Sequence, residues 1–524
     1  MPLRPPAGYI RPGYDPLKVP NAPTIGTPSA GNTQVSVVFT APTNVGGSAI
    51  TGYQAVAYAS GSYVSNTAGT SSPITVTGLS NGTAYTFQVW AQNTYGPSAY
   101  SAMSASATPS PPSFISDLYN GYGNSVATDS SSNVYVAGYQ SSVNYWELAK
   151  YDSTGTLLWQ KNFDVTGSYV KIRTDSSGNV LLVQPSSSNI RVIKVSSSGT
   201  ITWQRTIIGW PSGCSGVQIQ YAGVSCDTSG NVYVSAPVYA NCQYGYTVAK
   251  INSSGTIQWS RSLQSNLYGS EFVSCAADSS GNVYSVGGAT YGTSNRAFIC
   301  KHDTSGNLVW QRVIGYNSSS SAYAKGVAVS SDGSQVFLAG EVNGGYNQAL
   351  LACYDSSGNL SWARTLDNGS TTYGFGVACD SSSNAYITGY TSTNSAMYMA
   401  KYNSSGTLQW QRSITNASSR KSYGYDAAVD ANGSPIFFGL NTNSSNADAR
   451  FFTVKLPSDG SKTGTYTVSS TTWVYGASSL TAANYTPDYN LSPGKTPDSL
   501  SLSLTTPAYV LNTSSMTTGT VTLT

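Results

Sequence analysis

The chain has 524 residues, of which 9% are charged and 12% aromatic, with a formal net charge of +3. Its length is too great for one small core and predicts several domains. The few charges form no basic stripe, which excludes nucleic acid as a partner. No run of about twenty apolar residues exists, so membrane insertion is excluded as well. Abundant Gly, Ser, Thr, Asn and Tyr are typical of β-structure with tight turns.

Residues 1–20 form a proline-rich opening segment. Proline fixes φ and removes a backbone donor, so this segment is predicted to be an extended arm. Its apolar side chains favour an arm that grips a neighbour, and they are Tyr9, Ile10, Tyr14 and Leu17. The segment is too polar for a signal peptide. We therefore expect a protein made in a cytoplasm, which leaves the cell, if it does, without a cleaved signal.

Residues 21–109 alternate between short strand-like runs and turn residues, which predicts a small β-sandwich. The stretch "ITVTGLSNGTAYTFQVWAQNTYGPSAYS" resembles the second half of a fibronectin type III domain. Leu79 and Tyr85 stand where that family has its core Leu and its corner Tyr. Phe39 stands where the family usually has a buried Trp, an exchange of one large aromatic for another. The resemblance implies a spacer or adhesion module without chemistry of its own.

Two motifs then alternate, each repeating about every 50 residues. The first, "DSSSNVYVAG" at Asp129, has seven copies, aligned at Val134, Val180, Val232, Val283, Val336, Ala385 and Ile436. The second, as in "KYDSTGTLLWQKNF", places a Gly four residues before a Trp. It gives Trp159, Trp203, Trp259, Trp310, Trp362 and Trp410, and a degenerate seventh copy has Tyr466.

Strand-only units of this period predict a seven-bladed β-propeller. In the second unit, "VKIRTD", "NVLLVQ", "IRVIKVS" and "TITWQRTI" would be the four strands from the axis outwards. Each Trp would pack between blades, because a large flat side chain buries about 150 to 250 Å². The ring would span residues 113–466, and closure by a sequence-distant strand stays open.

Residues 467–524 contain strand-like runs without the repeat motifs, so they form a strand-rich tail that packs either on its own ring or on another subunit. The predicted fold class is therefore all-β, with a fibronectin type III β-sandwich, a seven-bladed β-propeller and extended N- and C-terminal segments. The domains would be residues 1–20, 21–109, 113–466 and 467–524.

The sequence disfavours two classes of propeller enzyme. The Trp motif resembles the docking motif of pyrroloquinoline quinone dehydrogenases, but Asp152 is one residue closer to Gly155 than in that pattern, and adjacent cysteines are absent. A sialidase-like glycosidase needs arginines that converge on one carboxylate. The repeated arginines occupy one position per blade, where solvated charge at a sheet edge is the favoured interpretation: Arg205, Arg261, Arg312, Arg364 and Arg412.

No residue is predicted to be catalytic, cofactor-binding or metal-binding. The single histidine, His302, aligns with Tyr151, Tyr354 and Tyr402 and is interpreted as a packing variant. Asp-Ser-Ser-Gly-Asn turns could suggest calcium, but lone carboxylates in turns usually cap their own backbone. The seven cysteines contain no CxxC pair.

Among these cysteines, Cys226, Cys300 and Cys379 are interpreted as small core residues, since they fall at repeat positions within predicted strands. Cys214 and Cys242 lie in predicted loops of one repeat, and whether they pair stays open.

Aromatic residues recur six to eight positions before the Asp-Asn motif: Tyr122, Tyr169, Tyr221, Phe272, Tyr373 and Tyr423. They would lie near the start of each inner strand, around one face. One interpretation is a surface for sugars, on which tyrosine rings stack. The other, which we favour at this point, is that the rings fill the core between blades.

Taken together, the arm "PPAGYIRPGYDPLKVPNAPT", the sandwich, the propeller and the tail resemble bacteriophage virion proteins of the tail or fibre type, as in marine and cyanobacterial phages. The resemblance implies a non-catalytic virion protein at the tail, fibre or capsid surface. Its arm or sandwich would dock on the particle and its propeller would face outward. Expected partners are other virion proteins, copies of the same chain, and a host-surface glycan or protein. The alternative is a bacterial surface or secreted adhesion protein.

Overall fold

The computed structural model divides into two compact units, residues 1–112 and 113–524. It describes residues 18–110, 113–118, 122–140, 145–163, 169–185, 189–208, 221–240, 243–264, 273–291, 294–314, 321–343, 345–393, 395–416, 420–443, 449–460, 464–468, 471–477, 481–484, 498–499, 503–505, 511–513 and 518–522. Every regular element in these ranges is a strand. Residues 1–17 of the predicted Pro-rich arm, with Tyr9, Ile10, Tyr14 and Leu17, lie outside the described residues, as do Cys214 and Cys242.

The first unit is an antiparallel sandwich, as the sequence predicts. Its strands are β1 (Thr24–Ile25), β2 (Ser29–Gly31), β3 (Gln34–Val37), β4 (Phe39–Thr40), β5 (Gly52–Ala59), β6 (Ser62–Gly69), β7 (Ile74–Thr77), β8 (Tyr85–Asn93) and β9 (Gly96–Pro97). They form the sheets β2-β3-β7 and β6-β5-β8-β9 and the pair β1-β4. Leu79 and Phe39 are buried in the core between them, and the Tyr85 hydroxyl accepts a hydrogen bond from the Ser80 amide at 3.0 Å. This is the corner that the fibronectin type III resemblance predicts.

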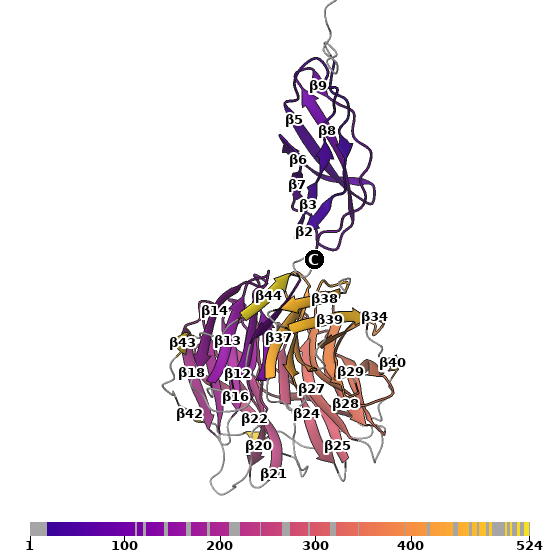
Figure 1. The fold of residues 1–524 in the computed structure, drawn as a ribbon. Coiled ribbons are helices and arrows are strands. Elements are labelled where there is room, and N and C mark those ends of the chain that lie inside the picture. Colours follow the sequence, from indigo (N-terminus) through magenta and orange to yellow (C-terminus); the bar gives the residue numbers. More distant parts are fainter. Residues whose placement is uncertain are drawn as a thin grey trace, which may run out of the picture. The chain divides into compact units, whose positions relative to one another are not determined.

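The second unit is a closed ring of seven blades (Figure 1). The inner strands are β11 (Tyr122–Thr128), β15 (Lys171–Thr174), β19 (Gly223–Cys226), β23 (Val273–Ala277), β27 (Ala322–Val329), β31 (Thr372–Cys379) and β35 (Lys421–Val429). Each contacts the next, and β35 contacts β11, so these seven strands surround the axis of the ring.

Three further strands complete each blade. The second strands are β12 (Val134–Gln140), β16 (Val180–Pro185), β20 (Val232–Ala240), β24 (Val283–Tyr291), β28 (Gln335–Asn343), β32 (Ala385–Thr391) and β36 (Pro435–Thr442). The third are β13 (Tyr145–Tyr151), β17 (Ile190–Val195), β21 (Gln243–Ile251), β25 (Ser294–His302), β29 (Asn347–Asp355), β33 (Met397–Tyr402) and β37 (Ala449–Lys455). The fourth are β14 (Leu157–Phe163), β18 (Ile201–Ile208), β22 (Ile257–Gln264), β26 (Leu308–Ile314), β30 (Leu360–Asp367), β34 (Leu408–Asn416) and β10 (Phe114–Leu118).

The core lies between blades, which explains the near-continuous apolar second strands. In β16, successive side chains point to opposite faces of the sheet. Val180 and Leu182 join the cluster shared with the first blade, whereas Leu181 and Val183 join the cluster shared with the third. Every residue of β16 is buried. A blade therefore needs apolar residues on both faces, unlike a sheet with one face in water.

The ring is closed by a strand from the start of the unit. β10 pairs antiparallel with β37, with Phe114 opposite Lys455, and thereby supplies the fourth strand of the seventh blade. A sequence-distant strand thus closes the ring. The degenerate motif at Tyr466 does not form that strand; it lies in β38 (Gly464–Val468), which pairs with β39 (Thr471–Ala477) at the edge of the sixth blade.

The C-terminal tail packs on its own ring. After β39 on the sixth blade, its strands pair with the outer strands of the fifth, third, second, first and seventh blades in that order. These strands are β40 (Thr481–Asn484), β41 (Asp498–Ser499), β42 (Ser503–Thr505), β43 (Leu511–Thr513) and β44 (Thr518–Thr522). The tail therefore retraces the ring in the reverse direction. Among the described residues, only the fourth blade has no added strand.

Candidate functional site

The Asp-Asn motif forms a turn whose carboxylate binds its own backbone. Asp175 Oδ1 accepts hydrogen bonds from the amides of Ser177 at 3.0 Å and Asn179 at 2.9 Å. Gly178 has φ of 75°, a conformation that glycine adopts without strain. This confirms the capping interpretation. Within the described residues, no group of three His, Cys, Asp or Glu side chains is placed to hold a metal ion.

The Trp motif links each blade to the next through a hydrogen bond and ring packing, and this link is called the fastening between blades. Trp203 Nε1 donates to the Ser253 carbonyl at 2.9 Å, in the turn between the third and fourth strands of the following blade. The same bond recurs in six pairs: Trp159–Ser197, Trp203–Ser253, Trp259–Thr304, Trp310–Ser356, Trp362–Ser404 and Trp410–Ser458. The predicted role as a packing device between blades is therefore confirmed.

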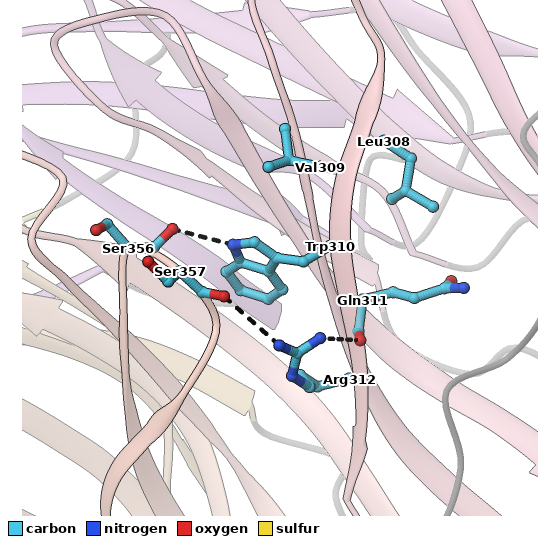
Figure 2. Close-up of a pocket in the computed structure, with 7 residues that line it drawn as sticks. All are labelled: Leu308, Val309, Trp310, Gln311, Arg312, Ser356 and Ser357. Carbon is cyan, nitrogen blue, oxygen red and sulfur yellow. Dashed lines mark hydrogen bonds between the residues drawn. The ribbon is translucent and has the colours of Figure 1, made fainter.

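The repeated arginines belong to the same fastening, so their interpretation as solvated edge charges was wrong. Figure 2 shows one copy, in which Arg312 Nη2 lies 3.5 Å from the Ser357 carbonyl. The Arg312 guanidinium also lies over the Trp310 ring, 5.6 Å from its centroid. Arg205, Arg364 and Arg412 each donate through Nε to the glycine carbonyl of the next turn, at 2.8 to 2.9 Å. The arginines stay one per blade and do not converge.

Beside this fastening lies an open groove of about 620 Å³, lined by Leu308, Val309, Trp310, Gln311, Arg312, Ser356 and Ser357 (Figure 2). Its polar groups already bond to one another, since Trp310 Nε1 donates to the Ser356 carbonyl at 3.0 Å. The groove lies where the outer strand of the fourth blade meets the turn of the fifth, so it is a feature of the packing between these two blades.

His302 is a packing residue, as predicted. It is fully buried, and its ring lies 6.5 Å from that of Trp259. Burial, with the Arg261 charge nearby, lowers the pKa of His302 to about 4, so the ring is neutral at pH 7. Cys300 is also fully buried, which raises its thiol pKa to about 12. Cys226 and Cys379 are partly buried against the core clusters, and burial raises their thiol pKa values to about 12, so all three cysteines are unreactive packing residues.

Four of the six recurring aromatic residues are described with their side chains. Tyr169 and Tyr221 precede the second and third inner strands, and their rings meet edge to face at 4.5 Å. Tyr373 lies near the start of β31 and Tyr423 near the start of β35. Phe272 and the side chain of Tyr122 lie outside the described parts. The predicted position at the start of the inner strands holds for these four.

Within the described residues, four inner strands contain a β-bulge. In β27, β31 and β35 the pairing skips Lys325, Phe375 and Tyr425, and β11 has the same irregularity after Gly123. An extra residue in a bulge is turned out of the ladder, which redirects its side chain. One side of the axis, over the fifth to seventh blades, therefore carries additional side chains between its inner strands.

Two of these bulged residues, Phe375 and Tyr425, belong to an aromatic cluster, defined as Tyr373, Phe375, Tyr390, Tyr423 and Tyr425. The Tyr390 ring lies 4.6 Å from Tyr423, 4.8 Å from Tyr373 and 5.7 Å from Phe375. Phe375 meets Tyr425 edge to face at 5.4 Å. All five are partly exposed, not fully buried. The cluster therefore packs on itself and still presents ring surface to solvent, which departs from the core interpretation favoured by the sequence.

A buried ion pair adjoins the aromatic cluster. Lys325 Nζ donates to Glu341 Oε2 at 2.8 Å, and both residues are buried. The same ammonium lies 4.0 Å from the Phe375 ring centroid and 5.3 Å from that of Tyr373. A cation over a ring face is attracted by the ring quadrupole, so this pair holds the rings in place.

A second polar group, the axial ion cluster, consists of the charged residues Lys171, Arg173 and Asp426 together with the hydroxyl of Ser125. Asp426 Oδ2 accepts from Ser125 Oγ at 2.6 Å and from the Val126 amide at 3.1 Å. It lies 3.2 Å from Lys171 Nζ and 3.3 Å from Arg173 Nη1. One carboxylate thus joins the inner strands of the seventh, first and second blades.

This cluster does not form a catalytic pair. Ser125 is fully buried and its Oγ also accepts the Ile172 amide at 3.1 Å, so a substrate cannot approach it. Although burial opposes ionisation of Asp426, Lys171 and Arg173 hold its pKa below the ordinary value. A carboxylate kept ionised by two cations is a poor proton acceptor. The arrangement is suited to fixing charge at the axis, not to acid–base chemistry.

Sequence reasoning missed the bulged residues and both ion clusters. The sequence does contain a signal for the bulge, because the spacing between the recurring aromatic residue and the following Asp is one residue longer in a bulged blade. The spacing is seven residues from Tyr373 to Asp380, in a bulged blade, and six from Tyr169 to Asp175. No repeat pattern marks Asp426, because the equivalent positions in the fifth and sixth blades are the glycines Gly326 and Gly376.

Two family models match the chain. Residues 20–106 match the fibronectin type III domain, and residues 87–363 match the model described as outer membrane protein assembly factor BamB. The second match covers more than half of the chain. The chain therefore belongs to the BamB family. In this BamB-type propeller the four-stranded antiparallel blades follow a fibronectin type III domain.

Solved structures with some likeness are distant, and no curated protein matches the sequence. The polysaccharide lyase Uly1 has 9% identity and a TM-score of 0.44, covering 64% of this chain and 90% of its own. The rhamnogalacturonan lyase YesW has 11% identity and a TM-score of 0.33, covering 84% and 90%. Regucalcin, a calcium-binding protein from Agrobacterium tumefaciens, has 10% identity and a TM-score of 0.30, covering 65% and 93%.

A search for membrane spans over the described part of the chain found no helix of sufficient length and hydropathy.

Proposed function

We propose that this chain is a non-catalytic binding protein whose propeller attaches to glycans through the aromatic cluster. The observation that carries the proposal is that five aromatic rings of the sixth and seventh blades pack together near the inner strands and remain partly exposed. Ring faces stack on sugar faces, and tyrosine hydroxyls add hydrogen bonds at a low entropic cost. Buried Lys325 and Glu341 pre-organise the rings, which reduces the cost of binding.

A glycan-binding assay tests this proposal on the purified full chain. A glycan array identifies a bound sugar, and calorimetry then gives its Kd for Tyr423→Ala and Tyr390→Ala. We expect each variant to weaken binding at least about tenfold, equivalent to about 1.4 kcal/mol. The matched control is Tyr63→Ala, since Tyr63 is an exposed tyrosine of the sandwich. Absence of binding by the unchanged chain, or an equal effect of Tyr63→Ala, would refute the proposal.

The same proposal places the protein on a bacteriophage particle, as a tail, fibre or capsid-surface component. Its support is the resemblance of the arm, sandwich, propeller and tail to virion proteins, together with the absence of a catalytic pair among the described residues. Purified particles from the native source provide the test, by mass spectrometry of copy number. A fixed stoichiometry that fits a symmetric particle is the expected outcome.

The family match favours a second candidate, a bacterial envelope or adhesion protein. The family description names an outer membrane protein assembly factor. A chain of that kind would fractionate with cell envelopes in the absence of particles. Finding it there, with none in purified virions, would replace the phage assignment and leave the glycan proposal to its own assay.

A further inference from the structure

Arg173 has unused hydrogen-bonding capacity at the centre of the ring. Its Nη1 donates to the Ile172 carbonyl at 2.8 Å and lies 3.4 Å from the Val126 carbonyl and 3.3 Å from Asp426 Oδ2. Within the described residues, its Nε and Nη2 make no hydrogen bond. About a quarter of the side chain, 26%, is exposed. A guanidinium has five donors in a planar fork, so the three donors on Nε and Nη2 have no hydrogen-bond partner among the described residues.

The charge balance around Arg173 favours an anion. In the part of the chain that the structure describes, Asp426 is the one carboxylate that contacts both Lys171 and Arg173. Arginine keeps its charge at every pH that a protein experiences. Although burial lowers the pKa of Lys171, the carboxylate counters this shift. The cluster therefore carries more positive than negative charge, and poorly screened charge attracts a counterion more strongly than surface charge does.

Aromatic rings adjoin this charge. Tyr169 lies two residues before Lys171, and its ring meets that of Tyr221 edge to face at 4.5 Å. Tyr425 directly precedes Asp426 in β35. Burial raises the pKa of Tyr169 far above its ordinary value, so its hydroxyl stays a donor. Tyr425 joins this side of the axis to the aromatic cluster.

We infer that the glycan bound by this propeller is anionic, with its carboxylate or sulfate on Arg173 and its sugar ring on the neighbouring tyrosines. The inference rests on the proposed glycan-binding function and names the class of sugar. A planar fork bonds both oxygens of a carboxylate or sulfate, which gives charge and geometry together. A neutral sugar would leave the open donors of Arg173 without an anionic partner.

The test compares three probes on the full chain: a polyuronate, a sulfated polysaccharide and neutral dextran. We expect the polyuronate or the sulfated polysaccharide to bind, and dextran to bind at least about tenfold more weakly, which corresponds to about 1.4 kcal/mol. Arg173→Gln should weaken the affinity for the anionic probe at least about tenfold. Arg312→Gln, the same change on an outer strand, should leave that affinity unaltered. The two anionic probes distinguish a carboxylate from a sulfate ligand.

A salt titration keeps the inference testable if Arg173→Gln fails to fold. Affinity of the unchanged chain for the anionic probe should fall as sodium chloride rises, whereas any dextran binding should not. Equal binding of dextran and both anionic probes, or insensitivity to salt, would overturn the anionic site and leave glycan binding intact. No binding of any glycan would overturn the proposed function itself.

Discussion

Replacing Gly406 by alanine tests the fastening between the fifth and sixth blades. Gly406 lies in the turn that receives Trp362 and has φ of 76°. An added Cβ would lie 2.5 Å from Trp362 Cδ2 and 2.8 Å from Cγ. The ring cannot retreat freely, because Trp362 is buried and its Nε1 donates to Ser404 at 2.9 Å. Arg364 Nε is held by the Gly406 carbonyl itself at 2.8 Å.

The expected loss has two parts. A left-handed conformation costs a non-glycine residue about 1 to 2 kcal/mol. Displacing the ring also breaks the Trp362 and Arg364 bonds, each with a net value of about 1 kcal/mol. The free energy of unfolding should therefore fall by about 3 to 4 kcal/mol in Gly406→Ala.

Gly433→Ala is the matched control. Gly433 has the same φ of 76°, and nothing lies within 4 Å of the Cβ that alanine would add. Only the conformational cost of about 1 to 2 kcal/mol is expected there. Urea unfolding of both variants, with midpoint and slope compared to the unchanged chain, provides the measurement. Equal losses in the two variants would refute the fastening as a source of stability.

Three further predictions concern the ring. Trp362→Phe keeps a ring but removes the bond to Ser404, so unfolding free energy should fall by about 1 to 2 kcal/mol; no change would show that the bond contributes nothing. A chain ending at residue 463 loses every tail strand and exposes the outer edges of the blades, so chromatography with light scattering should show association, and a stable monomer would contradict this. Asp426 has a lowered pKa and therefore stabilises the ring above its ordinary pKa near 4. This contribution is lost as pH falls through the lowered pKa, and an acid titration of Asp426→Asn should lack that part of the loss.

The ring and the sandwich could be predicted because their determinants are local and repeated. A Gly in each hairpin turn, an Asp-Asn turn and a Trp recur at nearly constant intervals, and each copy reports the same strand order. The tyrosine corner of the sandwich is likewise predicted from Tyr85 and Leu79, which lie only six residues apart. Features of this kind can be predicted without knowing which distant parts of the chain are in contact.

The candidate site could not be predicted, because it consists of departures from the repeat. The bulge at Tyr425 depends on one additional residue in the strand. A consensus of the seven repeats does not show an insertion that only some copies contain. Asp426 acquires its role only through Lys171 and Arg173, more than 250 residues away in the sequence. The role of Arg364 was misjudged for the same reason, since its partner turn belongs to another blade.

The closing strand has a consequence for synthesis. β10 emerges near the start of the ring, yet its partner β37 begins at Ala449, some 330 residues later. At about 5 to 20 residues per second, a ribosome takes roughly 20 to 60 seconds to reach it. Throughout that interval Ile115, fully buried in the finished protein, lacks its core partners, which all lie between Ala378 and Leu456. During synthesis the nascent chain must therefore shelter an apolar strand, either by a temporary contact within itself or by a chaperone.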